Sequence, residues 1–337
     1  MKRLLSFIVF LAMLAPLVNV HAQDPNFSQF FSSPLTISPA LAGNGESNWR
    51  AMANLRNQWV GLGSPYRTMS FSADGKLIQG EYNSNSYVGI GGMLLVDDAM
   101  DGIYKSTYFS ANASYHVNFD ADDVHGLALG LGAVYNKTNI DFSKLSFGQQ
   151  LSTSGFNRAL PTGEVALSNI PGYTSVTAGA MYTYTTENTV FDFGIAGYRF
   201  LKSKRSVMND PTQYDEPRYN AHFDFGTSLN ERTNLSINAL YLSQAKATSL
   251  TVGGALGFSH GLDDYSLRVL NLGVYYRVGD AVIPYVGYVY NDVQLGLSYD
   301  VTVSKIMTGS IAPKTFELSL IYRHSKTFSN KIPCPGR

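Results

Sequence analysis

The chain has 337 residues, and its 25 Lys and Arg residues balance its 25 Asp and Glu residues, so the formal net charge is zero. Charged residues make up 15% of the sequence, against about 25% in a typical soluble domain. This balance, without a polybasic run, argues against nucleic acid as a partner.

The first 22 residues have the features of a secretory signal. Lys2 and Arg3 precede an apolar run over 4–18, and the tripeptide VHA then places small residues where a signal peptidase cleaves. We predict a signal peptide over 1–22, removed after Ala22; the alternative is an uncleaved membrane anchor. The rest of the chain has no apolar run of the about 20 residues that a spanning helix needs.

Export and composition together indicate a membrane β-barrel. The chain contains 22 Tyr, 19 Phe and 31 Gly residues and few charges. This composition is typical of an outer-membrane barrel, which has an apolar outer face and aromatic girdles. The predicted partner of that face is outer-membrane lipid. A secreted β-sandwich or jelly roll is the alternative.

Residues 23–47 form a distinct segment that opens with QDPNFSQFFSSPLTISPALAG. Its prolines keep it extended and out of a strand ladder, while its many apolar side chains must pack somewhere. We predict an irregular, plug-like segment at or in the periplasmic mouth of the barrel. Two roles stay open: packing that seals the barrel, and a docking surface for a partner. The candidate residues are Gln23, Asp24, Pro25, Phe27, Phe30, Phe31, Pro34 and Pro39.

Alternation of apolar and polar residues is the main signal over 48–324. In VQLGLSYDVTVS, at 293–304, every second residue is apolar or aromatic, which is the period of a β-strand with one apolar face. The segment is longer than most soluble strands but fits a tilted membrane strand. We predict an all-β, transmembrane, antiparallel up-and-down barrel of about 14 strands. The strands start near Trp49, Tyr66, Tyr87, Tyr104, Gly126, Tyr173, Val190, Arg218, Asn234, Ser249, Arg268, Ala281, Val293 and Thr315.

An even number of strands predicts that both termini lie in the periplasm. With this orientation the long connections 139–172 and 202–217 face outward, and short turns such as 186–188 and 291–292 face inward. Short inner turns and long outer loops are the asymmetry expected of outer-membrane barrels.

The two tryptophans bracket the first predicted strand. Trp49 and Trp59 share one face of that strand, and ten tilted residues span roughly the about 25 Å between the two aromatic girdles. We predict that both are girdle residues. Their placement turns the other face inward, so that the lumen receives Arg50, Asn54, Arg56 and Gln58.

A charged side chain in the lumen needs a partner. In a closed barrel the last strand pairs with the first, which brings Glu317 near Arg56. We predict that Arg56 pairs with Glu317 or Asp300 and helps to fix closure; the alternative is that Arg56 faces lumenal water.

Residues for catalysis are sparse, and we expect no enzyme, no metal site and no cofactor. His222 could serve an outer-face phospholipase, but no nucleophile is marked nearby. The acidic pair Asp97 and Asp98, and the group at 120–123, lack the spacing of a calcium loop and are predicted to be solvated turns.

The chain ends in a predicted periplasmic tail, 325–337. It contains the only cysteine, Cys334, which is free, paired with another chain or modified, since one thiol makes no internal disulfide.

Several stretches, in order along the chain, resemble the PorP/SprF family of the Bacteroidetes type IX secretion system. They are the opening QDPNFSQFFSSPLTISPALAG, RNQW at 56–59, SPY at 64–66, IDFSKLSFGQQ at 140–150, GDAVIPYVG at 279–287, LGLSYDVTVSK at 295–305, FELSLIY at 316–322 and PCP at 333–335. The chain departs from many relatives by ending in Gly336-Arg337 and not in an aromatic residue. If a terminal aromatic is the barrel-assembly signal, 316–322 or Phe328 must replace it.

The resemblance implies an outer-membrane protein that supports protein secretion and, in gliding bacteria, surface attachment of adhesin-like proteins. Its implied partners are periplasmic and outer-membrane proteins of the secretion machinery and large secreted cargo proteins. A diffusion porin or small-solute transporter is the alternative function, and it would require a watery lumen. A soluble secreted β-protein is a third class.

Overall fold

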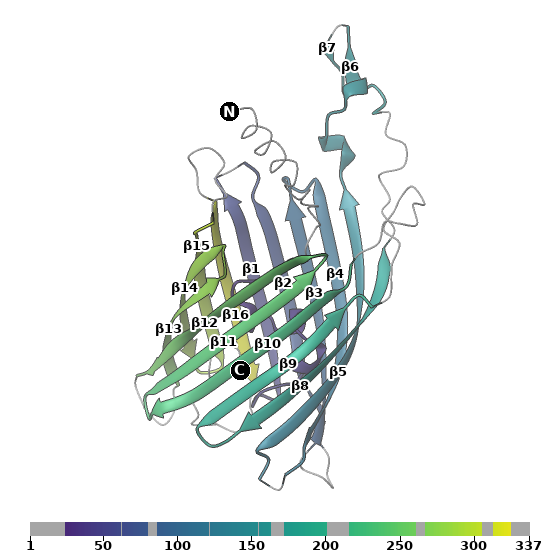
Figure 1. Cartoon of the computed structure of the whole chain (residues 1–337). Helices are drawn as coiled ribbons and strands as arrows, with labels where there is room; N and C mark the ends of the chain where they lie inside the picture. Colours follow the sequence, from purple (N-terminus) through teal and green to yellow (C-terminus); the bar gives the residue numbers. More distant parts are fainter. Residues whose placement is uncertain are drawn as a thin grey trace, which may run out of the picture.

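The computed structural model describes residues 24–61, 63–79, 86–120, 122–153, 155–162, 172–200, 216–260, 267–304 and 313–324. In these ranges the chain forms a closed antiparallel barrel of 14 strands around a short irregular segment (Figure 1). The signal peptide, Gln23, the tail 325–337 with Cys334, and parts of the predicted outer loops lie outside the described residues.

The barrel strands follow one another around the wall in chain order, so the up-and-down topology is confirmed. They are β1 (Trp49–Val60), β2 (Tyr66–Gln79), β3 (Ser86–Ala99), β4 (Tyr104–Asn118), β5 (His125–Ile140), β8 (Tyr173–Thr185), β9 (Thr189–Tyr198), β10 (Arg218–Asn230), β11 (Thr233–Gln244), β12 (Ala247–Ser259), β13 (Arg268–Arg277), β14 (Ala281–Tyr290), β15 (Val293–Thr302) and β16 (Lys314–His324).

Closure occurs between the first and last strands. β1 pairs with β16 from Trp49↔His324 to Arg56↔Glu317, and the register shifts between Asn57 and Val60. Because each strand presents alternate residues to opposite sides, this register turns Arg56 and Glu317 into the lumen together.

Side chains separate by face as the alternation predicts. Large apolar residues cover the outer face, with Leu131 at 70% and Leu129 at 56% exposure as examples on β5. Small and polar residues face the lumen and are buried there. An apolar outer belt suits contact with lipid. Closure of the barrel meets a second requirement of the membrane, because it leaves no unpaired backbone edge.

The two ends of the barrel differ in their connections. We call the end at which β1 finishes the long-loop end, because it carries the connections 141–172 and 199–217. The first of these contains η4 (Phe142–Lys144), η5 (Gly148–Gln150) and a small hairpin of β6 (Leu151–Ser152) and β7 (Gly155–Phe156), which projects from this end of the barrel (Figure 1). The opposite, short-turn end has tight connections such as 231–232 and 291–292.

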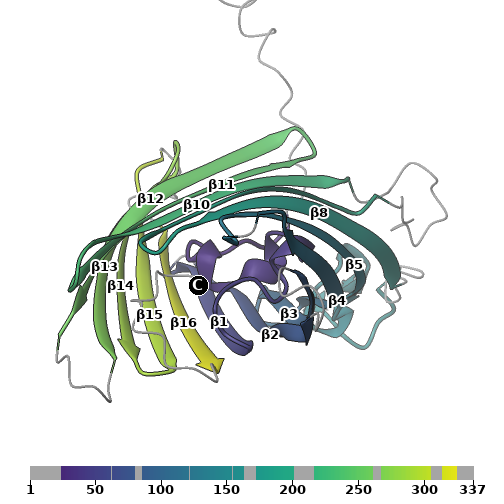
Figure 2. The ribbon, with the colours of Figure 1, turned by 90° about the horizontal axis from the view of Figure 1, so that it is seen from below.

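Three short 3-10 turns lie inside the barrel. They are η1 (Phe30–Ser32), η2 (Pro34–Thr36) and η3 (Pro39–Leu41). Figure 2, which looks along the barrel, shows these turns surrounded by the wall. Proline starts two of them, at the first position, where its missing N–H costs no hydrogen bond. The N-terminal segment, residues 24–47, is therefore a filling of the lumen.

Among the described residues, no helix is long and apolar enough to cross a membrane.

Candidate functional site

The filled lumen is the candidate functional site. The apolar side chains of the N-terminal segment are almost fully removed from solvent, with Leu35 at 1% and Phe30 at 2% exposure. Burying a side chain of this kind stabilises a fold by about 1.5–3 kcal/mol. The segment therefore belongs to the folded core of the barrel.

Aromatic packing joins the segment to one side of the wall. The Phe31 ring stacks on Tyr275 of β13 at 5.2 Å between centroids and meets the edge of Tyr285 of β14 at the same distance. Phe30 adds an edge contact with Tyr275 at 6.2 Å. Such pairs contribute about 0.5–1.5 kcal/mol each beyond the area that they bury.

Glycines in the opposite side of the wall make room for the segment's backbone. A methyl group added at Gly89 of β3 would overlap the carbonyl of Ala42, and one at Gly130 of β5 would overlap the backbone between Pro39 and Ala40. Gly43 approaches the Cα atom of Gly89 so closely that an added methyl would lie 2.9 Å from it. We call Gly89, Gly91, Gly130 and Gly179 the glycine track, because each would meet the segment if it had a side chain.

Glu317 anchors the segment toward the long-loop end. Its carboxylate accepts hydrogen bonds from the backbone N–H groups of Ser28, at 2.6 Å, and Gln29, at 2.8 Å. It also pairs with the Arg56 guanidinium at 3.0 Å. Both charged side chains are 1% exposed, so these bonds offset the large cost of removing the two charges from water.

Asp300 and Arg277 complete this charged group. Asp300 lies 3.4 Å from Arg56 and 3.0 Å from Arg277, and its two oxygens accept from the Ser28 hydroxyl at 2.8 and 2.9 Å. We call Ser28, Arg56, Arg277, Asp300 and Glu317 the seam cluster. Two cations and two carboxylates balance in it, which is the condition under which buried charges are tolerated.

Asp24 makes a second set of charged contacts at the long-loop end. Its carboxylate pairs with Arg199, directly after β9, and with Arg218, at the start of β10, the latter at 3.2 Å. Its backbone N–H donates to Gln244 at 2.9 Å. Arg218 also donates to the Thr36 carbonyl at 2.8 Å, so it holds two points of the segment.

At the short-turn end a smaller set of bonds holds the segment. Asp74 of β2 accepts from the Gly43 N–H at 2.6 Å and pairs with Arg50 at 2.9 Å. Arg50 in turn donates to the Leu41 carbonyl at 3.0 Å, and Asn44 donates to Asp192 at 3.2 Å. The segment is therefore bonded at both ends of the lumen.

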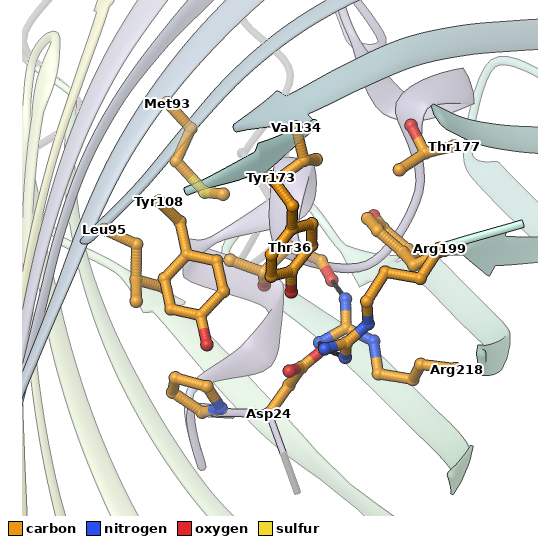
Figure 3. A pocket seen from close by; sticks show the side chains of 12 residues that line it. Asp24, Thr36, Met93, Leu95, Tyr108, Val134, Tyr173, Thr177, Arg199 and Arg218 are labelled. Atoms are coloured by element: carbon orange, nitrogen blue, oxygen red, sulfur yellow. Dashed lines mark hydrogen bonds and ion pairs between the residues drawn. The ribbon is translucent and has the colours of Figure 1, made fainter. Parts of the chain in front are cut away.

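A pocket remains between the segment and the β3–β10 side of the wall. Figure 3 shows Tyr108, Tyr173, Arg199 and Arg218 converging on it around Asp24. The pocket is small and partly open to solvent. Aliphatic side chains, among them Met93, Leu95 and Val134, complete a mostly apolar lining.

The structure brings Arg56 together with both carboxylates predicted for it, and Arg56 is not in contact with open lumenal water. Trp49 and Trp59 lie on the outer face at opposite ends of β1, at 43% and 53% exposure. Trp49 contacts Tyr322 and Trp59 contacts Tyr66, at 5.3 and 6.1 Å between rings. The assignment of both tryptophans to the aromatic girdles stays a prediction.

The segment extends further than the prediction placed it. A position at the periplasmic mouth requires contacts at one end only, but residues 24–47 contact the wall from one end of the lumen to the other. Among the candidate residues, Phe27, Phe30, Phe31, Pro34 and Pro39 are buried in their own barrel, which favours the sealing role over a docking surface.

Two statements from the sequence need correction: the solvated turn at Asp97 and Asp98, and the possible outer-face site at His222. Asp97 and Asp98 belong to β3, and Asp97 is buried in the lumen, where Thr68 donates to it at 2.6 Å. They are not a solvated turn because β3 continues past them. His222 faces the lumen at 1% exposure, so it cannot act in an outer-face lipid site.

Sequence reasoning missed the partners of the segment. Arg199, Arg218 and Arg277 each hold it, but they come from parts of the wall far from it in the chain. The alternation over 268–278 puts Arg277 on the polar face of its strand, and this signal could have marked it as a lumenal charge in need of a partner. Within the described ranges, no group of three or more metal-ligating side chains gathers.

Comparisons with solved structures find matches that cover most of this chain at low similarity. The toluene transporter TbuX of Ralstonia pickettii has a TM-score of 0.48 and 10% identity over 87% of this chain and 93% of its own. A FadL homologue of Pseudomonas aeruginosa has a TM-score of 0.47 and 9% identity, over 89% and 99%. CdiB from Acinetobacter baumannii has a TM-score of 0.39 and 9% identity, over 82% and 60%. At these values the likeness carries no argument about function. No similarity to a curated protein sequence was found.

The closed barrel, its apolar outer belt and its polar, filled lumen define an outer-membrane β-barrel protein. A family model described as type IX secretion system membrane protein PorP/SprF matches residues 19–322. The chain therefore belongs to the PorP/SprF family and is a type IX secretion system membrane protein. The family resemblance inferred from the sequence is confirmed.

Proposed function

We propose that this protein is a docking barrel of the type IX secretion system: it supports secretion or surface attachment of large cargo proteins by holding cargo and machinery together. The observation that carries the proposal is a lumen occupied by the protein's own N-terminal segment. A barrel filled in this way has no open water channel in this proposal, and it acts through the loops and turns that it presents to partners.

The way in which the segment is held supports a permanent filling. Its side chains are buried, its backbone fits the glycine track, and charged side chains bond it at both ends of the lumen. Releasing it would expose several large apolar side chains and remove the Ser28 and Gln29 N–H donors that help to balance the burial of Glu317. The lumen therefore stays closed to diffusing solutes in this proposal.

The same arrangement gives no support to an enzyme. In the described lumen the buried carboxylates are engaged with arginines or with the segment, and Asp97 is engaged with the hydroxyls of Tyr66 and Thr68. The protein in this proposal acts by binding other proteins and carries out no chemical reaction.

A transporter for small apolar solutes is the second candidate. The pocket beside Asp24 favours it, because an apolar lining with a few converging polar groups is the usual form of a ligand site. In this candidate a solute would enter from the long-loop end and the segment would act as a gate.

Single-channel recording on the purified barrel separates the two candidates. We expect no steady conductance from the intact protein, and a steady conductance from a variant that lacks residues 24–43. A steady, large conductance from the intact protein would contradict the docking proposal and favour the transporter.

Deletion of the protein in cells tests the docking role directly. We expect cargo proteins to be lost from the cell surface while uptake of small solutes is unchanged. Unchanged cargo display together with slower uptake of an apolar solute would contradict it. Crosslinking in intact outer membranes, followed by identification of the attached proteins, then names the machinery and cargo partners.

A further inference from the structure

The N-terminal segment has a direction, and its first described residue lies at the long-loop end. Asp24 contacts Arg199 after β9, Arg218 at the start of β10 and Gln244 at the end of β11. All three positions belong to the end of the barrel that carries the connections 141–172 and 199–217. The chain thus enters the lumen from that end.

The other end of the segment lies at the opposite mouth. Gly43 bonds Asp74, near the end of β2, and Asn44 bonds Asp192, near the start of β9. Asn48 then donates to the carbonyl of His324, the last residue of β16, at 2.8 Å. The segment therefore crosses the whole lumen before β1 begins.

Outer-membrane barrels place their long loops outside the cell and their short turns in the periplasm. Applied to this barrel, the rule puts Asp24 at the external mouth and His324 at the periplasmic one. We infer that the amino end of the mature chain opens on the cell exterior, where an extracellular partner can reach it, while the end of β16 faces the periplasm. This inference concerns topology and stands independently of the proposed docking role.

The inferred topology replaces the expectation that both termini lie in the periplasm. An even number of strands fixes only the two ends of the barrel itself. The segment adds one further crossing, because it passes through the lumen without joining the wall. The amino end therefore lies at the mouth of the barrel opposite the one at which β1 starts.

The segment also bonds both sides of the seam at which the barrel closes. Ser28 and Gln29 bond Glu317 of β16, while the carbonyl of Ser32 accepts from Asn54 of β1 at 3.1 Å. The segment therefore links β1 to β16 in addition to the direct pairing of the two strands.

Cysteine labelling in intact cells tests the inference. In a Cys334→Ser background, one cysteine is introduced as Gln23→Cys and treated with a membrane-impermeant maleimide. Thr153→Cys in the long connection after β5 is the external control, and Asp122→Cys in the turn between β4 and β5 is the periplasmic control. Both control positions are exposed, and heat-modifiable migration in gels shows that each variant is folded.

We expect Gln23→Cys to react on intact cells to the same extent as Thr153→Cys, without permeabilisation. Labelling that requires permeabilisation, as for Asp122→Cys, overturns the inference and puts the amino end in the periplasm. Failure to label under either condition also overturns it, because an amino end that opens on the cell exterior has to react with the reagent. A short epitope inserted between Ala22 and Gln23, and detected on intact cells, provides a second measurement with the same two outcomes.

Discussion

The two ends of the N-terminal segment are held by different kinds of contact. Toward the long-loop end, carboxylates and guanidinium groups from several strands surround Asp24 and Ser28. Toward the short-turn end, Ala42 and Gly43 lie against Gly89 and Gly75, where the wall has no side chains. The first end is held by charged groups, and the second adds a close fit of backbone against glycine to the bonds made by Asp74 and Arg50. One segment thus combines an electrostatic anchor with a steric one.

Neutralising Glu317 should have the largest effect. Glu317→Gln leaves Arg56 only its longer ion pair with Asp300, at 3.4 Å, and breaking a buried ion pair from one side costs about 3–5 kcal/mol. We expect a lower midpoint of unfolding in urea for the purified barrel. Glu187→Gln, in the exposed turn between β8 and β9, is the matched control. Equal stability of the two variants would show that the seam cluster does not hold the segment.

A methyl group in the glycine track should rank second. Gly89→Ala forces the Ala42 carbonyl away from β3, and overpacking of this kind costs about 1–3 kcal/mol. Gly92→Ala, on the same strand, is the control, because its methyl group would lie 3.7 Å from the nearest atom, the carbonyl oxygen of Ser110. Protease sensitivity of residues 24–47 reports release of the segment. A protected segment in both variants would contradict the steric anchor.

Removing the Asp24 charge should have a smaller effect. Asp24→Asn leaves Arg199 and Arg218 as neighbouring like charges, and because the site is partly open we expect a loss of about 1–2 kcal/mol. The loss should shrink in 1 M salt, which screens the repulsion, whereas the loss caused by Gly89→Ala should not. Asp292→Asn, in the exposed turn between β14 and β15, is the control. An identical salt response of the Asp24 and Gly89 variants would remove the distinction between the two anchors.

The smallest effect should come from the outer face. Trp49→Ala removes the ring contacts with Tyr322 and His324 at 5.3 and 5.6 Å, which predicts a loss of about 0.5–1.5 kcal/mol. The segment should stay protected from protease in this variant, since no part of it contacts the outer face. Release of the segment would mean that wall and filling are coupled more strongly than their contacts indicate.

Much of the wall could be predicted from the sequence. All 14 predicted strand starts lie within two residues of the observed ones, because a strand between lipid and lumen repeats its pattern with period two. The neighbourhood of Arg56 and Glu317 followed from closure alone, since the last strand of a barrel must meet the first. Both inferences need only local pattern and topology.

The path of the segment could not be predicted in the same way. Whether it stops at one mouth or crosses the lumen depends on where Gly89, Gly130 and Gly179 leave room, and these come from three different strands. The pairing of Asp24 with Arg199 and Arg218 depends equally on the folded wall. The composition of residues 23–47 showed that they must be buried, but it carried no information on the shape that receives them.

The crossing of the lumen also determines how the molecule bears mechanical force. A pull on the amino end from outside passes first into β9, β10 and β11 through the contacts of Asp24. It reaches the start of β1 only after those contacts and the seam cluster have broken in turn. Tension from an attached load would therefore spread into the middle of the wall before it reached the seam, which is the place where a barrel can open.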